Sequence, residues 1–551
     1  MTMEATENNE DSRRPDPNSN GLRLFKAPTF NIEQLPFEIL AHIFQLYVIE
    51  DKQERTASSV RPNGAFPLGS VCRTWRRVAW TSQHLWSSLS FWMRKETTEN
   101  QIQLAIEWLG RACQHPLEIS LQGYIEEDLS LDSRSQQNFV AILSPLIDAI
   151  GRSLDRCNRL ELLNLPSSTY ARLTLSGKPP VALQYLTLRC ADPIARLDLA
   201  LAAPVFLQLE GIPMDCLSID YANLTEFSVS EIPINQVQQV LAGAPRLVKC
   251  YLMDIDDTDD EEWERKSVVC REMTELRACP MYYHNDVVAD LLRSITCPSL
   301  RVFSVVDHVS LNLHTLIGFL LRSSCPLTHL TIGEENTTCE DLVRIATALP
   351  SLTFLSLTKY EEAAVALRSS SSVNSFCHTL CLDERYHTVS DVDSVNQKNS
   401  MPVMLPGLRH LLIETRSLFS WEYLPGLRSR YCYEANGTRL REEMGRSALE
   451  SISIIYEHPD RGYDGRDSDI HHKIHVDESD SEKYLIQNWD TFSQLVKLSG
   501  EIRLDLQVER GFWREHLFAL SYTALKRTSG RPPEDVKQFM CSRTWAPQRL
   551  T

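Results

Sequence analysis

Apolar residues recur along most of the chain in one short unit: a leucine, then apolar residues three and five positions later. Five copies follow a proline, and these copies begin at Leu247, Leu300, Leu327, Leu352 and Leu408. Copies without that proline spacing begin at Leu183, Leu224 and Leu449. The alternation places apolar side chains on one face of a short strand, and proline ends the helix before it. The pattern therefore predicts a series of short strands.

The spacing between strands leaves room for one helix per unit. Successive leading leucines are 23, 27 and 25 residues apart at Leu224–Leu247, Leu300–Leu327 and Leu327–Leu352. The gap of 56 residues from Leu352 to Leu408 fits two units, with a missing strand at Cys377–Leu382. Amphipathic helices are expected between strands, for example at residues 313–321 and 341–349.

These units resemble a degenerate leucine-rich-repeat array, whose period is about 20–29 residues. Each unit exposes an apolar face that only its neighbours can cover. The resemblance implies an α/β fold, in which a helical N-terminal module is followed by an irregular solenoid with a curved parallel sheet. The alternative is a conventional α/β domain with several leucine-rich strands, and the five proline-led copies favour the repeat array.

A different pattern occupies residues 35–92. After Leu-Pro, apolar residues recur at spacings of three and four in residues 39–47, which predicts an amphipathic helix. A second helix is expected over residues 68–80, with Val71, Trp75 and Val78 on one face. Such short helices cannot bury two tryptophans and this much aliphatic surface among themselves. Exposed apolar patches of this kind indicate a protein interface.

This segment resembles an F-box, the module that docks F-box proteins onto the Skp adaptor subunit of cullin-based ubiquitin ligases. One departure from the pattern is a long polar connection at residues 49–64. The alternative is an ordinary helical hairpin that caps the array. The resemblance implies an adaptor-binding face formed or supported by Leu35, Pro36, Ile39, Leu40, Ile43, Phe44, Val71, Cys72, Trp75 and Trp86.

The expected organisation follows from these two patterns. A strand at residues 502–506 and a helix around residues 512–525 are expected to close the array. The expected divisions are a disordered tail (1–28), the F-box (31–92), a helical connector with the first repeat (97–150), the solenoid (151–510) with flexible loops near 254–264 and 458–483, and a C-terminal helix and tail (511–551).

The amino-acid composition limits the classes of function that this chain can have. With 73 acidic and 56 basic residues, the net charge of −17 argues against binding to nucleic-acid backbones. Residues 1–28 lack the apolar core of a secretory signal, and we expect no membrane span. Fifteen cysteines without a Cys-x-x-Cys pair are typical of reduced thiols in the cytoplasm or nucleus.

Three clusters with possible metal ligands are interpreted as non-sites. His471, His472 and His475 lie in a polar segment, and Cys377 and Cys381 are expected to be core thiols beside His378 and His387. The acidic run 254–262 lacks the glycine and final glutamate of a calcium loop. No phosphate loop, Gly-x-Ser-x-Gly or His-Glu-x-x-His motif is present, so we expect no enzyme, metal or cofactor.

The sequence therefore predicts the substrate-recognition subunit of a Skp–cullin–F-box ubiquitin ligase, which holds a target protein and acts by proximity. The layout is similar to that of fungal F-box proteins with divergent repeats. The alternative is a scaffold that carries an F-box or leucine-rich repeats outside any ligase. The positions expected to face the target on the sheet are mixed in character: Lys249, Tyr251, Arg301, Ser304, Thr328, His329, Thr331, Thr353, Phe354, Ser356, Arg409 and His410.

Overall fold

The structure is a computed structural model, and its chain divides into two compact units, Met1–Trp86 and Ser87–Thr551. The tail 1–28, the loop 458–483 and residues 54–64 of the polar connection lie outside the described residues. The structure describes residues 35–53, 65–94, 97–123, 133–175, 180–190, 197–199, 202–257, 266–279, 287–305, 313–333, 338–358, 372–381, 404–415, 421–424, 449–457, 485–500, 502–510, 513–543, 545 and 548–549.

The first unit is helical. Its elements are α1 (Phe37–Gln53), α2 (Ala65–Val71), α3 (Arg73–Thr81) and the short 3-10 helix η2 (Gln83–Trp86). The amphipathic helix expected from residue 39 onward is α1, and it runs six residues beyond the predicted stripe. The single helix expected over residues 68–80 is wrong, because the chain breaks at Cys72 into two helices.

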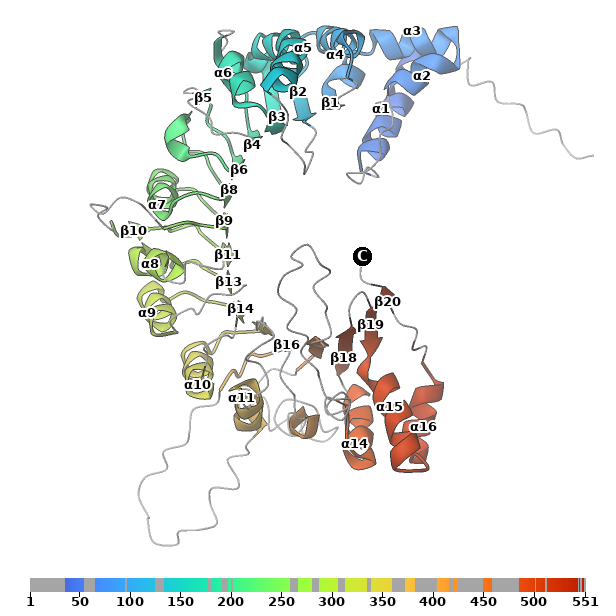
Figure 1. Ribbon diagram of the computed structural model, residues 1–551, viewed down its shortest axis with the longest axis vertical. Helices are drawn as coiled ribbons and strands as arrows, with labels where there is room; N and C mark the ends of the chain where they lie inside the picture. Colours follow the sequence, from blue (N-terminus) through green and yellow to red (C-terminus); the bar gives the residue numbers. More distant parts are fainter. Residues whose placement is uncertain are drawn as a thin grey trace, which may run out of the picture. The chain divides into compact units, whose positions relative to one another are not determined.

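The second unit is built on a sheet of 16 strands, of which the first fourteen run parallel (Figure 1). Two further strands pair antiparallel at its end. The parallel strands, in order, are β1 (Ser88–Trp92), β2 (Leu117–Gln122), β3 (Cys157–Leu165), β4 (Tyr185–Cys190), β6 (Phe206–Glu210), β8 (Glu226–Ser230), β9 (Lys249–Met253), β11 (Glu275–Cys279), β13 (Val302–Val305), β14 (His329–Gly333), β15 (Phe354–Thr358), β16 (His410–Thr415), β17 (Ser451–Glu457) and β18 (Arg503–Arg510).

The register of the sheet confirms the repeat. Leu330, Leu355 and Leu411 are paired across β14, β15 and β16, and all three are buried. The leading leucines that follow a proline, such as Leu300 and Leu352, are also buried and precede their strands as predicted. Stacking therefore aligns equivalent apolar positions into continuous rows, which no single unit could bury by itself.

Helices cover the face of the sheet that these leucines occupy (Figure 1). The helices expected at 313–321 and 341–349 are α9 (Leu313–Ser323) and α10 (Cys339–Ala348). Two short parallel ladders, β5 (Leu197–Asp198) with β7 (Leu217–Ser218) and β10 (Val268–Val269) with β12 (Ile295–Thr296), accompany the sheet. The other helices up to β16 are α4 (Glu99–Arg111), α5 (Ser133–Gly151), α6 (Ser167–Leu175), α7 (Ile234–Gly243), α8 (Val287–Ser294) and α11 (Ser372–Cys381).

The missing strand expected at Cys377–Leu382 is wrong. Residues 372–381 form α11, in which Cys377 is fully buried, and β15 pairs directly with β16. The long gap between Leu352 and Leu408 is therefore one enlarged unit and not two. The expectation fails because Cys377 and Leu380 also lie at helical spacing, so the same apolar residues suit a helix that packs on its neighbours.

The acidic run 254–262 is not wholly a loop. Asp254 follows β9 with a positive φ of 48°, and its N–H donates to the carbonyl of Cys279 at 2.7 Å. Ile255 is buried and Asp256 bridges to Pro233. Aspartate tolerates the left-handed conformation better than most residues, so the start of the run serves as a turn. Residues 258–265 lie outside the described part of the chain.

The helix expected around residues 512–525 to close the array begins later than predicted and follows an additional strand. Residues 513–516 form β19, which pairs antiparallel with β18, and the helix α15 begins at Leu517 and ends at Thr528. The short β20 (Gln548–Arg549) pairs with β19. The helices α14 (Trp489–Ser499) and α16 (Glu534–Cys541) contact each other beside this end of the sheet (Figure 1).

His516 should make the stability of this end depend on pH. Its ring stacks on Phe518 and meets the Trp545 ring at 4.6 Å. Burial lowers the pKa of His516 below its usual value, and the charge on Arg543 acts in the same direction against the opposing Asp505. The unfolded chain therefore binds a proton at His516 more readily than the folded chain does. The free energy of unfolding has its full value above about pH 6.5 and falls as the pH drops toward the pKa of His516 in the folded chain.

We therefore expect the Tm to fall when the pH is lowered from about 7.5 to about 5.5, and to fall less in His516→Phe. His42→Asn, on the exposed side of α1, is the matched control and should follow the unaltered protein. An equal fall in His516→Phe and in the unaltered protein would contradict this assignment. The measurement is differential scanning calorimetry at the two pH values.

Candidate adaptor-binding surface

The apolar stripe of α1 divides into two faces. Leu40 and Phe44 are buried, with 1% and 0% of their surface exposed, whereas Ile39 and Ile43 are 50% and 38% exposed. Residues four apart share a helix face, and neighbouring residues lie about 100° apart around the axis. The sequence pattern thus combines one row that forms the core of the unit with a second row that faces outward.

Aromatic packing holds the helices of the first unit together. The rings of Phe44 and Trp75 lie 4.8 Å apart between centroids, and Phe66 meets the edge of Trp86 at 5.8 Å. Trp86 is buried, and its indole N–H donates to the carbonyl of Ala79 at 2.8 Å. A buried tryptophan needs such a partner for its polar atom. The Leu-Trp at the end of the motif therefore anchors η2 to α3.

Cys72 separates α2 from α3. Its backbone is extended, with φ −153° and ψ 174°, and its Sγ accepts a hydrogen bond from the Trp75 N–H at 3.4 Å. Arg76 then donates to the carbonyl of Gly69 at 2.8 Å and ties the two helices together. A Cβ on Gly69 would lie 3.2 Å from the Trp80 indole nitrogen, so glycine permits the close approach of the helices.

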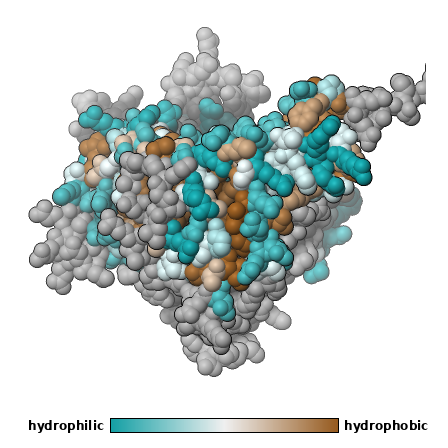
Figure 2. Space-filling model, turned by 90° about the horizontal axis from the view of Figure 1, so that it is seen from above, coloured by the Kyte–Doolittle hydropathy of each residue, from teal (hydrophilic) through white to brown (hydrophobic). Residues whose placement is uncertain are grey.

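The outward surface of this unit is unusually apolar. Eight of the fifteen exposed large apolar residues of the described chain belong to it, although it is much the smaller unit. In Figure 2, patches of hydrophobic surface lie between hydrophilic side chains. The eight are Phe37, Ile39, Ile43, Leu46, Tyr47, Phe66, Val71 and Trp80. Contiguous exposed apolar surface is typical of a protein interface.

The ten residues predicted for the adaptor-binding face lie in different environments. Pro36, Ile39, Ile43 and Val71 are exposed, and Leu35, Cys72 and Trp75 are half-buried. Leu40, Phe44 and Trp86 are buried in the unit itself, so they support the surface and cannot contact a partner directly. The predicted shared face of Val71, Trp75 and Val78 is wrong, because Val71 belongs to α2 and is 60% exposed while Val78 is buried in α3.

Sequence reasoning left several exposed residues out of the predicted site. Phe37, Leu46, Tyr47, Phe66 and Trp80 all contribute to the outward surface. The predicted apolar stripe already ends at Tyr47, and the same helical period could have found Leu46, which lies three residues after Ile43. No comparable signal identifies Phe66 or Trp80, because their exposure depends on how α2 and α3 pack.

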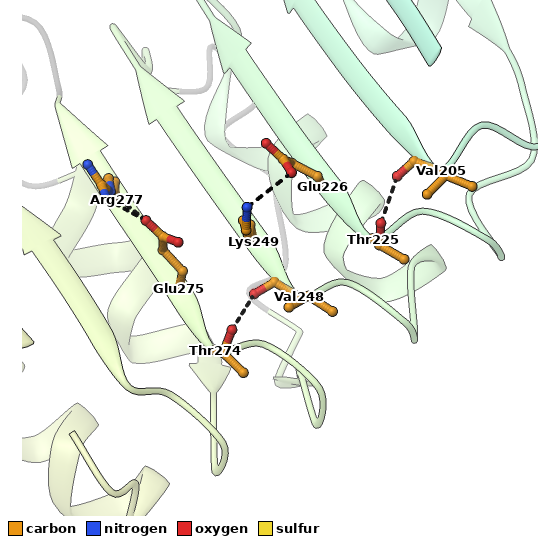
Figure 3. A network of polar contacts seen from close by, with 8 residues as sticks. All are labelled: Val205, Thr225, Glu226, Val248, Lys249, Thr274, Glu275 and Arg277. Carbon is orange, nitrogen blue, oxygen red and sulfur yellow. Dashed lines mark hydrogen bonds and ion pairs between the residues drawn. The ribbon is translucent and has the colours of Figure 1, made fainter. Parts of the chain in front are cut away.

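The second unit offers the other face of its sheet, opposite the buried leucines. On β8, β9 and β11, charged side chains pair along this face: Lys249 with Glu226 at 3.4 Å and Arg277 with Glu275 at 2.6 Å (Figure 3). The hydroxyl of Thr225 donates to the carbonyl of Val205 at the start of the same ladder. The charges of this stretch neutralise one another, so no net charge is left to select a ligand.

Further pairs continue the pattern on earlier strands. Arg159 pairs with Glu161 at 2.6 Å and Arg189 with Glu210 at 3.1 Å. Burial raises the pKa of Glu210 above its usual value, against the lowering effect of Arg189. Ser356, expected on this face, alternates with the core residues Leu355 and Leu357 but is itself buried, so it is not accessible to a target.

The candidate metal clusters gain no support as sites. The described residues contain no group of three or more His, Cys, Asp or Glu side chains that could hold a metal ion. His378 meets the ring of Tyr423 at 5.1 Å, and His387, His471, His472 and His475 lie outside the described residues. Burial raises the pKa of Cys157 to about 12, so this thiol is a core group and not a nucleophile.

Comparison with known protein families gives a match near the start of the chain. Residues 32–92 match the F-box-like family, and these residues form an F-box-like domain, a protein-interaction module. The match extends past the first unit into β1, the first strand of the sheet. No curated protein matches the chain.

Among solved structures, the chain is similar to the crystal structure of a TLR13–ssRNA13 complex. The sequences are 13% identical, the TM-score is 0.25, and the likeness covers 55% of this chain and 45% of the other. The chain thus spans less than half the length of that protein. The repeat fold consequently rests on the strand register described above. Within the described residues, no helix is long and apolar enough to cross a membrane.

Proposed function

We propose that this chain is the target-binding subunit of a Skp–cullin–F-box ubiquitin ligase. The observation that carries the proposal is the apolar outward surface of α1, α2 and α3, which lies within the residues that match the F-box-like family. Ile39 and Ile43 on α1 are exposed, and so are the basic side chains of Arg73 and Arg77 on α3. A Skp-type adaptor would cover the apolar side chains, and through it the chain would reach a cullin.

The mechanism that follows is proximity. The parallel sheet of the second unit presents the long face that holds a target protein, and the target then reacts at a raised effective concentration. This chain contributes no reacting group and needs no cofactor. Its place of action is the cytoplasm or the nucleus, and its layout is that of the fungal F-box proteins with divergent leucine-rich repeats.

Co-purification separates this function from a scaffold that works outside any ligase. We expect the full chain to retain both the adaptor and a cullin, and a version without residues 31–92 to retain neither. Quantitative mass spectrometry of the two purifications is the measurement. Retention of the adaptor without a cullin would favour the scaffold, and absence of both from the full-chain sample would contradict the proposal.

A further inference from the structure

Two cysteines of adjacent repeats lie opposite each other at the end of the short ladder β10–β12. The ladder pairs Val269 with Thr296. The N–H of Cys270 then donates to the carbonyl of Thr296 at 2.9 Å, so the ladder continues and the next pair is Cys270 with Cys297. Neighbouring strands lie about 4.8 Å apart, which is within the Cα separations of about 4.4–6.8 Å that a disulfide spans.

Both thiols lie on the buried face of this ladder. Val269, 56% exposed, stands between the buried Val268 and Cys270. On the neighbouring strand, the half-buried Thr296 precedes the fully buried Cys297. Because successive side chains of a strand point to opposite faces, the two cysteine side chains point the same way. The backbone therefore permits a disulfide between them without a change of register.

Cys270 is the more reactive thiol of the pair. The hydrogen bond from the Cys297 thiol lowers the pKa of Cys270 against the opposing effect of burial. The same hydrogen bond, followed by burial, raises the pKa of Cys297. Cys270 is also 6% exposed, whereas Cys297 is 0% exposed. Because the thiolate is the nucleophile, Cys270 is the residue that an oxidant attacks first.

A third thiol, Cys250, lies close enough to influence the pair but does not face a cysteine across the sheet. It belongs to β9, where its partners in register are Phe227 on β8 and Leu276 on β11. Burial raises the pKa of Cys250, and the charge of Cys270 acts in the same direction. Cys250 therefore stays a protonated core thiol.

A fourth thiol, Cys325, belongs to the unit that follows Cys297. The side chain of that unit that meets the Cys297 backbone is Ser323, whose Oγ accepts a hydrogen bond from the Cys297 N–H at 3.1 Å. Burial raises the pKa of Cys325 as well. Strand register thus selects Cys270 and Cys297 from the four thiols.

We propose that Cys270 and Cys297 form a redox switch, in which hydrogen peroxide oxidises the pair to a disulfide that fixes two adjacent repeats to each other. The Cys270 sulfur attacks one peroxide oxygen, the O–O bond breaks, and the leaving hydroxide takes the thiol proton and becomes water. The Cys297 sulfur then attacks the sulfenic sulfur of Cys270, and its proton leaves with the hydroxyl as a second water. Two thiols are oxidised, and one peroxide is reduced to two waters.

The disulfide would stiffen the part of the solenoid that carries the self-paired charges. Cys270 precedes β11 and Cys297 precedes β13, so the link joins the units of these two neighbouring strands. In a repeat array each unit contacts only its neighbours, and such a link opposes their separation. It also restricts the unfolded chain between the two cysteines. The switch does not depend on the adaptor or on a cullin, and it goes beyond the proposed function.

The test oxidises the full chain, first reduced with dithiothreitol and desalted, with hydrogen peroxide. The oxidised monomer is isolated by gel filtration, because the exposed Cys113 and Cys541 can link separate chains. Remaining thiols are blocked with N-ethylmaleimide, and trypsin releases residues 267–271 and 294–301, each with one cysteine of the pair. We expect mass spectrometry to find these two peptides joined and lighter by two hydrogens than their sum, and dithiothreitol to separate them.

Two variants and a melting experiment complete the test. Cys297→Ala should lose the joined peptides, whereas the matched control Cys325→Ala should retain them. Oxidation should raise the Tm of the unaltered chain by about 2 °C or more, dithiothreitol should reverse the rise, and Cys297→Ala should not show it. Melting of the reduced variants checks that the fold is retained.

Several outcomes would overturn the proposal. They are absence of the joined peptides from the oxidised chain, a link from Cys270 to Cys250 or Cys325 in their place, and loss of the link in Cys325→Ala. A Tm that falls or stays constant on oxidation would contradict the fixing of the two repeats. None of these results depends on whether the chain retains a Skp-type adaptor, so the switch and the proposed function are tested separately.

Discussion

Replacing Ile39 and Ile43 together by aspartate should abolish binding of the Skp-type adaptor. Both side chains lie on the outward row of α1 and leave the core formed by Leu40 and Phe44 untouched. A carboxylate that is desolvated in an interface without a partner costs several kcal/mol, so two should weaken binding by about a hundredfold or more. Surface plasmon resonance against the immobilised adaptor measures the loss.

The fold should survive this double substitution, because exposed aspartates on a helix remain hydrated. Leu321→Asp is the matched control, since Leu321 is 64% exposed on α9 of the second unit, and it should bind the adaptor as the unaltered chain does. Adaptor binding that persists in the double variant would remove the support for an interface on α1.

Trp86→Ala should unfold the first unit. The side chain is 1% exposed, packs edge-on against Phe66 and donates its N–H to the carbonyl of Ala79. Removing a buried tryptophan costs about 3–5 kcal/mol, which is a large part of the stability of so small a unit. We expect loss of its helical signal and of adaptor binding together, measured by circular dichroism of the full chain during urea titration.

Trp80→Ala is the control of equal size. Trp80 is 46% exposed, so its removal should change stability by less than about 1 kcal/mol while weakening adaptor binding. If Trp80→Ala and Trp86→Ala destabilise the unit equally, the division of the motif into an internal and an outward set is wrong.

The comparison of pattern with structure shows where each kind of inference is reliable. Long alternating patterns with proline boundaries predict strands well, as at Leu352–Leu357, because strand period and helix termination are local properties. Short apolar runs are ambiguous, and Cys377–Leu382 is helical because its residues also match the helical period. The break at Cys72 was missed because a cysteine that caps a helix has no strong sequence signature.

For this protein, the sequence by itself determined the order of parts: an F-box-like segment followed by stacked strand–helix units. These features depend on local spacing and on apolar residues that each unit must bury against its neighbours. The tertiary structure alone decided which aromatic residues are core and which are surface, since exposure depends on how helices pack. It also decided that His329, Phe354 and His410 form one row, because only strand register brings together residues that lie far apart along the chain.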